Sequence, residues 1–243
     1  MKKIIIANWK DNLVATKSLT LAQKYKTIKI CDCLKAVVCP DFSAISSVAS
    51  IFKKTALQLG AQNCSALPIG AHTGEVSVEI LKSLGVKYVI VGHSERRACG
   101  ESDEVVSQKA SKVLAAKMLP VVCVGETALE RRSGNTLLTL ERQIRGALGK
   151  LPKNLKSARI ILAYEPVWEI GSGKMLAASE AEETCLIIKN FAKKCGALKV
   201  EVIFGGSINK NNSQEYLNKK NIDGLLVGGA SLDFKNFSQI VNC

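Results

Sequence analysis

Residues 159–174 read RIILAYEPVWEIGSGK, and this stretch decides how the rest of the chain is interpreted. The apolar run 159–163 predicts a buried strand that delivers one carboxylate, Glu165, to its carboxyl end. Pro166 has a fixed φ and no N–H group, so it disfavours continuing the strand. The glycines and Trp168 that follow are typical of a loop that moves as a unit, covers an apolar site and presents backbone N–H groups to an anion. An ordinary strand-to-helix loop with a solvated glutamate is the alternative at this point.

Further short apolar runs of the same kind are spread along the chain. Together with residues 159–163, they predict strands at 3–7, 36–39, 57–61, 88–92, 120–124, 201–204 and 224–227. Unbroken apolar runs suit strands that are buried on both faces of a parallel sheet. Between them, periodicity and capping residues predict helices near 16–28, 43–53, 77–84, 129–148 and 179–194, with another beginning at Ser102 and one closing the chain.

Alternating strands and helices over this length predict an α/β fold, a single (β/α)8 barrel that forms one domain over residues 1–243. No linker, low-complexity segment or shift in composition divides the chain. A doubly wound open sheet is the other fold to consider. It is disfavoured because no Gly-x-Gly-x-x-Gly motif follows the first strand.

The chain is strongly basic, with 34 Lys and Arg against 21 Asp and Glu and a net charge of +13. The lysines are spread over the whole sequence, and no basic cluster is interleaved with aromatic residues. We therefore expect a solvated basic surface that steers a small anion inward, and no nucleic-acid partner. No apolar run approaches the ~20 residues of a membrane helix, so no membrane partner is expected.

Nine cysteines are scattered along the chain without a Cys-x-x-Cys pair, and the only histidines are His72 and His93. Zinc sites usually need a tighter cluster of cysteines or more histidines, so we expect no metal site. The pattern favours reduced and mostly buried thiols in a cytoplasmic protein.

The carboxyl ends of the strands of such a barrel meet at one face, where the active site lies. Polar residues and glycines follow several predicted strands, and we expect them to converge: Asn8, Lys10, His93, Glu95, Glu165, Gly205, Gly206, Ser207, Gly228 and Gly229. The loops after the seventh and eighth strands are the usual phosphate site of these barrels. Each residue taken alone has an ordinary structural explanation, so the prediction depends on their convergence.

This set of groups suggests proton transfer next to the carbonyl of a small phosphorylated molecule. A partly desolvated Glu165 gains basicity and can abstract the proton, while an imidazole and an ammonium stabilise the enediolate. An aldolase or epimerase would need a Schiff-base lysine on a central strand or a metal set, and neither is found. A catalytically weakened or silent phosphosugar-binding barrel remains an alternative.

The chain resembles the triosephosphate isomerases over its whole length. The motifs that carry the resemblance are ANWK at 7–10, GAQN at 60–63, TGEVS at 73–77, GHSERR at 92–97, AYEPVWEIGSGK at 163–174, GGS at 205–207 and VGGASL at 227–232. The resemblance implies a homodimer without a cofactor that interconverts dihydroxyacetone phosphate and D-glyceraldehyde 3-phosphate in glycolysis and gluconeogenesis.

The resemblance also implies a role for each site residue. Glu165 would shuttle the proton and His93 would be the neutral electrophile, a pairing already described for this enzyme family. Lys10 would supply a positive charge near the substrate, Asn8 would help at the carbonyl, and Glu95 would lie beside Lys10. The phosphate would be bound by Gly171, Ser207, Gly228 and Gly229.

The sequence departs from the family pattern at five places. Phe204 replaces a tyrosine whose hydroxyl helps to latch the closed lid, Glu169 replaces an alanine on the lid, and Lys174-Met175-Leu176 replaces a hinge of smaller residues. We therefore expect weaker lid closure than is typical. Asp11 replaces a residue that is usually small or apolar, and His72 replaces a phenylalanine. We expect the side chains of Asp11 and His72 to meet across the dimer interface.

Overall fold

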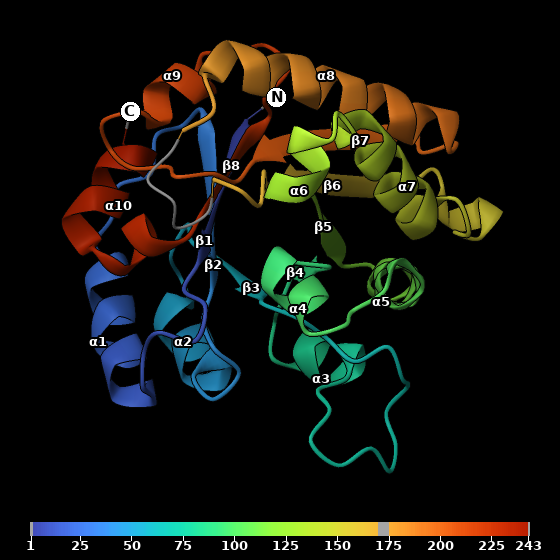
Figure 1. Ribbon diagram of the computed structural model, residues 1–243. Helices are drawn as coiled ribbons and strands as arrows, with labels where there is room; N and C mark the ends of the chain where they lie inside the picture. The colour runs from blue at the N-terminus through green and yellow to red at the C-terminus, as the bar shows by residue number, and fades with distance from the viewer. Residues whose placement is uncertain (1, 170–174, 243) are drawn as a thin grey trace.

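A computed structural model of the protein describes residues 2–169 and 175–242. Parallel strands pair in sequence order into a closed barrel, and β1 pairs with β8 to complete it (Figure 1). The strands are β1 (Lys3–Asn8), β2 (Leu34–Cys39), β3 (Gln58–Ala61), β4 (Tyr88–Val91), β5 (Leu119–Val124), β6 (Arg159–Tyr164), β7 (Lys199–Phe204) and β8 (Gly224–Val227). The (β/α)8 barrel predicted from the apolar runs is confirmed, and the open sheet is excluded.

Helices surround the barrel on its outer face (Figure 1). Within the described residues they are α1 (Ala15–Tyr25), α2 (Ile45–Phe52), α3 (Val78–Ser83), α4 (Ser94–Ala98), α5 (Asp103–Ala115), α6 (Ala128–Arg132), α7 (Thr136–Leu148), α8 (Ala178–Lys194), α9 (Ser213–Leu217) and α10 (Phe234–Val241). Short 3₁₀ helices, η1 (Lys153–Leu155) and η2 (Gly229–Leu232), complete the set.

Two of these helices, α4 and α9, were not expected from the sequence. The helical stretches expected within 129–148 form two helices, α6 and α7, because Gly134 adopts a left-handed φ of +71° between them. Helix α4 begins directly after β4, where we expected only the end of a strand, and the His93 side chain caps it by accepting the Glu95 N–H. Helix α9 has only five residues, too few for a periodicity signal.

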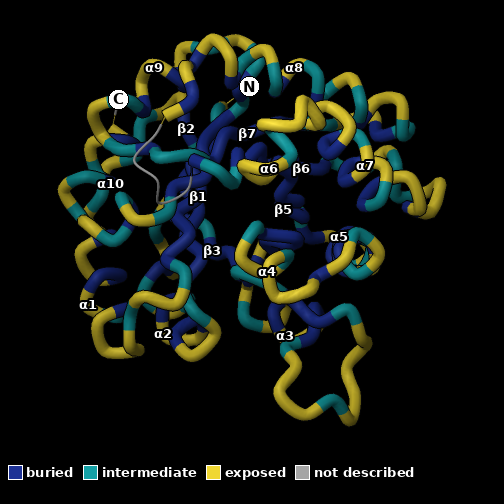
Figure 2. The backbone as a smooth tube through the Cα atoms, viewed as in Figure 1, coloured by how far each residue is buried: buried dark blue, intermediate teal, exposed yellow. Residues whose placement is uncertain are grey.

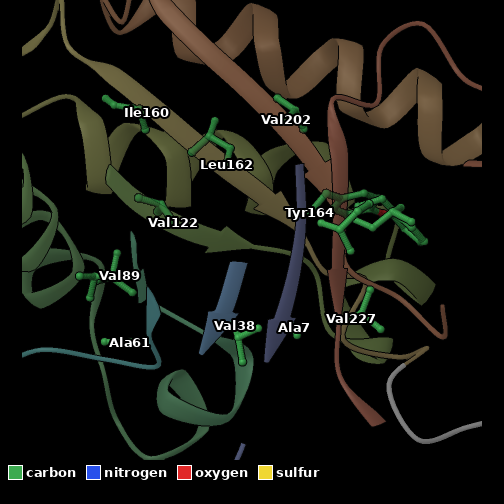
Figure 3. Packing of buried hydrophobic residues seen from close by; sticks show 14 of the residues in the cluster. Ala7, Val38, Ala61, Val89, Val122, Ile160, Leu162, Tyr164, Val202 and Val227 are labelled. Atoms are coloured by element: carbon green, nitrogen blue, oxygen red, sulfur yellow. The ribbon is translucent and has the colours of Figure 1, made fainter. Parts of the chain in front are cut away.

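Both faces of the barrel strands are buried, which explains their unbroken apolar sequences. One set of alternate side chains fills the barrel interior: Ile4, Ile6, Val37, Cys39, Tyr88, Ile90, Val121, Cys123, Ile161, Ala163, Ile203 and Leu226. The other set points outward and packs under the helices, as Figure 3 shows for Val38, Val122 and Leu162. Exposed residues are concentrated on the outer helices and loops (Figure 2), so the barrel is a rigid frame for the groups at its rim.

The chain between β3 and α3 extends away from the barrel as a long loop (Figure 1), and residues 65–76 are called the β3–α3 loop below. The backbone N–H of Ser65 donates to the Val76 carbonyl at 2.8 Å and closes the base of this loop. Two large apolar side chains on it are exposed to solvent, Leu67 by 45% and Ile69 by 62%. No helix forms within residues 65–76.

Eight of the nine cysteines lie within the described residues. Cys39, Cys64, Cys123 and Cys185 are buried, whereas the others are half-buried or exposed, so the expectation of mostly buried thiols holds for only half of them. Burial raises the pKa of Cys64 to about 12, which keeps that thiol protonated and unreactive.

Among residues 2–169 and 175–242 there is no cluster of His, Cys, Asp and Glu suited to a metal ion. None of the helices in these residues has the length and apolar character needed to cross a membrane.

Candidate active site

A cavity of about 770 Å³ opens at the carboxyl ends of the barrel strands. The predicted residues that line it are Asn8, Lys10, His93, Glu95, Glu165, Gly205, Gly206, Ser207, Gly228 and Gly229. They come from the ends of β1, β4, β6, β7 and β8, so strands far apart in sequence deliver them to one place. Gly171, the remaining predicted residue, lies outside the described residues.

The backbone of Glu165 is fixed by the barrel on both sides. Its N–H donates to the Val124 carbonyl at 2.8 Å, and the N–H of Gly205 donates to the Tyr164 carbonyl at 2.8 Å. Gly125 permits this close approach, because a Cβ at position 125 would lie 1.7 Å from the Glu165 carbonyl oxygen. The carboxylate is therefore held at the cavity wall with only 5% of the residue exposed.

The Glu165 carboxylate lies against His93, with 3.1 Å between Oε1 and Nε2. Burial alone would raise the pKa of Glu165, but the His93 imidazole, Cys123 and Lys10 together outweigh burial and hold that pKa below its usual range. This is opposite to the gain in basicity expected from desolvation. The imidazole that sequence reasoning could not place beside the carboxylate is the reason.

His93 has its two ring nitrogens in different environments. Its Nδ1 accepts the backbone N–H of Glu95 at 3.2 Å, at the start of α4. A ring nitrogen that accepts a hydrogen bond carries no proton, so the neutral ring carries its proton on Nε2 and donates it toward Glu165. Burial alone would lower the pKa of His93, but the Glu165 and Glu95 carboxylates outweigh burial and hold it above its usual range. We favour the neutral ring in this arrangement, because the backbone amide is fixed whereas the Glu95 side chain is 57% exposed.

Lys10 is held in an uncommon backbone conformation with φ +53°, in the left-handed region. The Gln62 side chain donates to the Lys10 carbonyl at 2.9 Å, and the Lys10 N–H donates to Asn8 Oδ1 at 3.2 Å. The Lys10 ammonium pairs with Glu95 Oε1 at 2.6 Å. Backbone strain of this kind persists where surrounding contacts enforce it, and here it directs the ammonium into the cavity rim.

The far end of the cavity is formed by the turns after β7 and β8. The Ser231 N–H and hydroxyl both bind the Gly228 carbonyl, at 2.8 and 2.6 Å, and fix the Gly228–Gly229 turn. A Cβ at Gly228 would point at the Lys10 side chain, 3.5 Å from its Cε. Backbone amides in such turns are suited to an oxyanion.

Ser207 has a contact that sequence reasoning did not predict. Its N–H donates to Glu169 Oε1 at 2.9 Å. From the sequence, Glu169 was expected on the lid, with no partner assigned to it. A carboxylate is thus bonded to one of the amides that were expected to bind an anion.

Gln62 and Glu126 support the site, although neither was expected from the sequence to have a role. Glu126 is fully buried, and its Oε1 accepts the Trp168 indole N–H at 2.8 Å while Arg131 lies 4.4 Å from the Trp168 ring centre. Glu126 could have been identified from its position in the sequence, because it follows β5 as Glu165 follows β6. These contacts fix the chain immediately after the Glu165 carboxylate.

Comparison with known proteins adds independent information. A profile of the family described as triosephosphate isomerase matches residues 3–243. The triosephosphate isomerase of Alkaliphilus oremlandii is 38% identical over 246 residues, which cover 99% of this chain and 99% of that protein. That of Dehalococcoides mccartyi (strain CBDB1) is 42% identical over 247 residues, 99% of this chain and 96% of that protein. That of Mesomycoplasma hyopneumoniae (strain 232) is 41% identical over 249 residues, 99% of each chain.

Proposed function

Because the chain belongs to the triosephosphate isomerase family and interconverts dihydroxyacetone phosphate and D-glyceraldehyde 3-phosphate, we propose that Glu165 is the base of this reaction. The observation that carries the proposal is the 3.1 Å contact between Glu165 Oε1 and His93 Nε2 at the wall of the cavity. It places a carboxylate and an imidazole N–H side by side. Proton transfer next to a carbonyl needs a base for the C–H group and a hydrogen-bond donor for the carbonyl oxygen, and such a pair suits both needs.

In the proposed complex the phosphate lies at the Ser207 and Gly228–Gly229 turns, where backbone amides suit an anion. Gly171 belongs to this phosphate site only as a prediction from the resemblance. The carbonyl end of the substrate lies between His93, Asn8 and the Lys10 ammonium. The size of the cavity, about 770 Å³, is ample for a triose phosphate.

The reaction is then a proton transfer carried by side chains of the chain itself. Glu165 removes a proton from the carbon next to the carbonyl, and the electrons of that C–H bond form the enediolate. The His93 Nε2–H and the Lys10 ammonium stabilise the oxygen as its negative charge grows. Glu165 returns the proton to the neighbouring carbon, while a proton moves between the two oxygens, so no atom is gained or lost.

The position of the carboxylate is tested by Glu165→Asp, which keeps the charge and withdraws it by one methylene. We expect kcat to fall by about 100-fold or more, because misplacement of a reacting group by about 1 Å has that effect. The matched control is Glu104→Asp, the same change on an exposed residue of α5 that pairs with Lys150. Equal turnover in both variants would refute the role of Glu165.

We also propose that the protein acts as a homodimer. A second cavity, of about 530 Å³, adjoins the first and is lined in part by Lys10, Asp11 and Phe42. The β3–α3 loop carries the exposed apolar side chains of Leu67 and Ile69, and such groups mark surfaces that another protein covers. The loop of one subunit would enter the second cavity of its partner, which would bring His72 near Asp11.

Three further proposals follow from composition and fold. The chain functions as one domain over residues 1–243, because the described strands close a single barrel. The reaction needs no cofactor, since every step is assigned to a side chain. A cytoplasmic location is supported by the buried thiols of Cys39, Cys64, Cys123 and Cys185, which form no disulfide. We propose that the basic surface does not bind nucleic acid. A catalytically silent barrel is disfavoured by the family membership.

A further inference from the structure

Glu169 is buried against the turn that follows β7. The residue is 0% exposed, and its carboxylate Oε1 accepts the Ser207 N–H at 2.9 Å. In return, the Ser207 hydroxyl donates to the Glu169 carbonyl at 3.4 Å. Both hydrogen-bond donors of Ser207, its N–H and its hydroxyl, are therefore engaged with Glu169, although Ser207 itself lines the cavity.

The carboxylate fits closely into this position. A Cβ at Gly206 would lie 2.6 and 2.7 Å from the two oxygens of the Glu169 carboxylate, and 2.6 Å from Phe204 Cζ. Glycine at 206 therefore makes room for the carboxylate beside the Phe204 ring. This is a packed contact and not a side chain that happens to lie on the surface.

The electrostatic environment is that of an anion held by backbone amides. Burial and the neighbouring Glu126 carboxylate raise the pKa of Glu169, while the Ser207 and Leu176 backbone groups lower it, with a net rise. Backbone amides at a turn are the kind of donor that also binds a phosphate oxygen. A single N–H can lie in line with only one acceptor, so an N–H shared between two anions binds each of them more weakly.

We propose that Glu169 competes with the phosphate group of the substrate for the Ser207 backbone amide and so lowers the affinity of this site for phosphate anions. The inference rests on the proposed function, which places the phosphate at Ser207 and the Gly228–Gly229 turn. A phosphate that takes the Ser207 N–H must break the bond to Glu169 and approach a buried group of the same charge. Removing the carboxylate eliminates both costs.

Two substitutions separate the charge from the hydrogen bond. Glu169→Ala removes both, whereas Glu169→Gln keeps an acceptor of the same size and removes only the charge. We expect the KM for D-glyceraldehyde 3-phosphate and the inhibition constant of inorganic phosphate to fall by about tenfold in Glu169→Ala. In Glu169→Gln we expect a smaller fall in the same direction. The kcat/KM for glyceraldehyde, which has no phosphate, is expected to stay at the wild-type value in both variants.

The control is Glu141→Gln, which makes the same change in net charge on the outer surface of α7, where Glu141 pairs with Arg145. It is expected to leave the inhibition constant unchanged.

Calorimetric titration with inorganic phosphate gives the same affinities without relying on turnover. It therefore distinguishes failure of this inference from failure of the proposed function, which would appear as absence of isomerase activity in the folded wild type. Unchanged or weaker phosphate binding in both folded Glu169 variants would overturn the inference.

Discussion

The hydroxyl of Tyr216, in α9, donates a buried hydrogen bond of 2.6 Å to the carbonyl oxygen of Leu176. The Tyr216 ring stacks on Phe204 at the end of β7, with 4.7 Å between ring centres and 10° between ring planes. Leu176 lies just before α8. Phe204 has no hydroxyl of its own, but it positions a tyrosine whose hydroxyl fixes the chain at Leu176.

Tyr216→Phe removes this hydroxyl and leaves the ring stack intact. Because the Leu176 carbonyl then loses a buried donor, we expect the free energy of unfolding to fall by about 1–2 kcal/mol. For a chain of this size, that corresponds to a fall in Tm of about 2–8 °C by calorimetry. An unchanged Tm would mean that the bond contributes nothing net to stability.

Phe204→Tyr adds a hydroxyl in a filled position. Phe204 is fully buried. A Cβ placed on Gly206 would lie only 2.6 Å from Phe204 Cζ, so there is little space around this ring atom, which lies beside the Glu169 carboxylate. We expect a loss of stability of about 1–3 kcal/mol from overpacking, together with a change in kcat or KM. Steady-state kinetics with the triose phosphate decides the second point. If kcat and KM both keep their wild-type values, the hypothesis that Phe204 weakens lid closure is wrong.

The barrel was predictable because every strand is buried on both faces, so each appears in the sequence as an apolar run ending at a polar residue or a glycine. Asn8, His93 and Glu165 could be assigned to the rim for that reason alone. Helix α4 was missed because its cap, His93, was interpreted only as a group at the end of a strand. Short helices bounded by such caps have no periodicity to detect.

The contacts between rim residues were not predictable, because they join parts of the chain that are distant in sequence. The lowered pKa of Glu165 depends on the position of His93 across the barrel. The partner of Glu169 depends on the turn after β7, and the hydroxyl that reaches Leu176 comes from α9. Residues 170–174, on which part of the lid hypothesis depends, lie outside the described residues.

The pH dependence of kcat/KM is expected to be set on its acid side by the His93–Glu165 pair. Glu165 has a lowered pKa and His93 a raised one, so His93 becomes protonated first as the pH falls. The mechanism uses the neutral imidazole, so kcat/KM should decline as His93 becomes protonated, before Glu165 does. Since the two groups interact, the observed midpoint belongs to the pair.

Glu95→Gln tests this assignment. Glu95 is one of the carboxylates that raise the pKa of His93, so its neutralisation should move the acid limb of kcat/KM to lower pH. The substrate phosphate titrates equally in both enzymes, and Glu104→Gln on α5 is the control for net charge. An acid limb that stays in place or moves to higher pH would contradict the role given to His93.

The strength of the proposed dimer is expected to depend on pH through Asp11 and His72. If the two meet across the interface, the protonated imidazole is the form that pairs with the carboxylate. The dimer is then tightest at acidic pH and weakens as rising pH removes that proton. Sedimentation equilibrium between about pH 5 and 8, where histidines titrate, measures this directly. Asp11→Asn and His72→Phe should each abolish the pH dependence, and both residues lie outside the cavity that holds Glu165. A dissociation constant that does not change over this range in the wild type would show that these side chains do not pair.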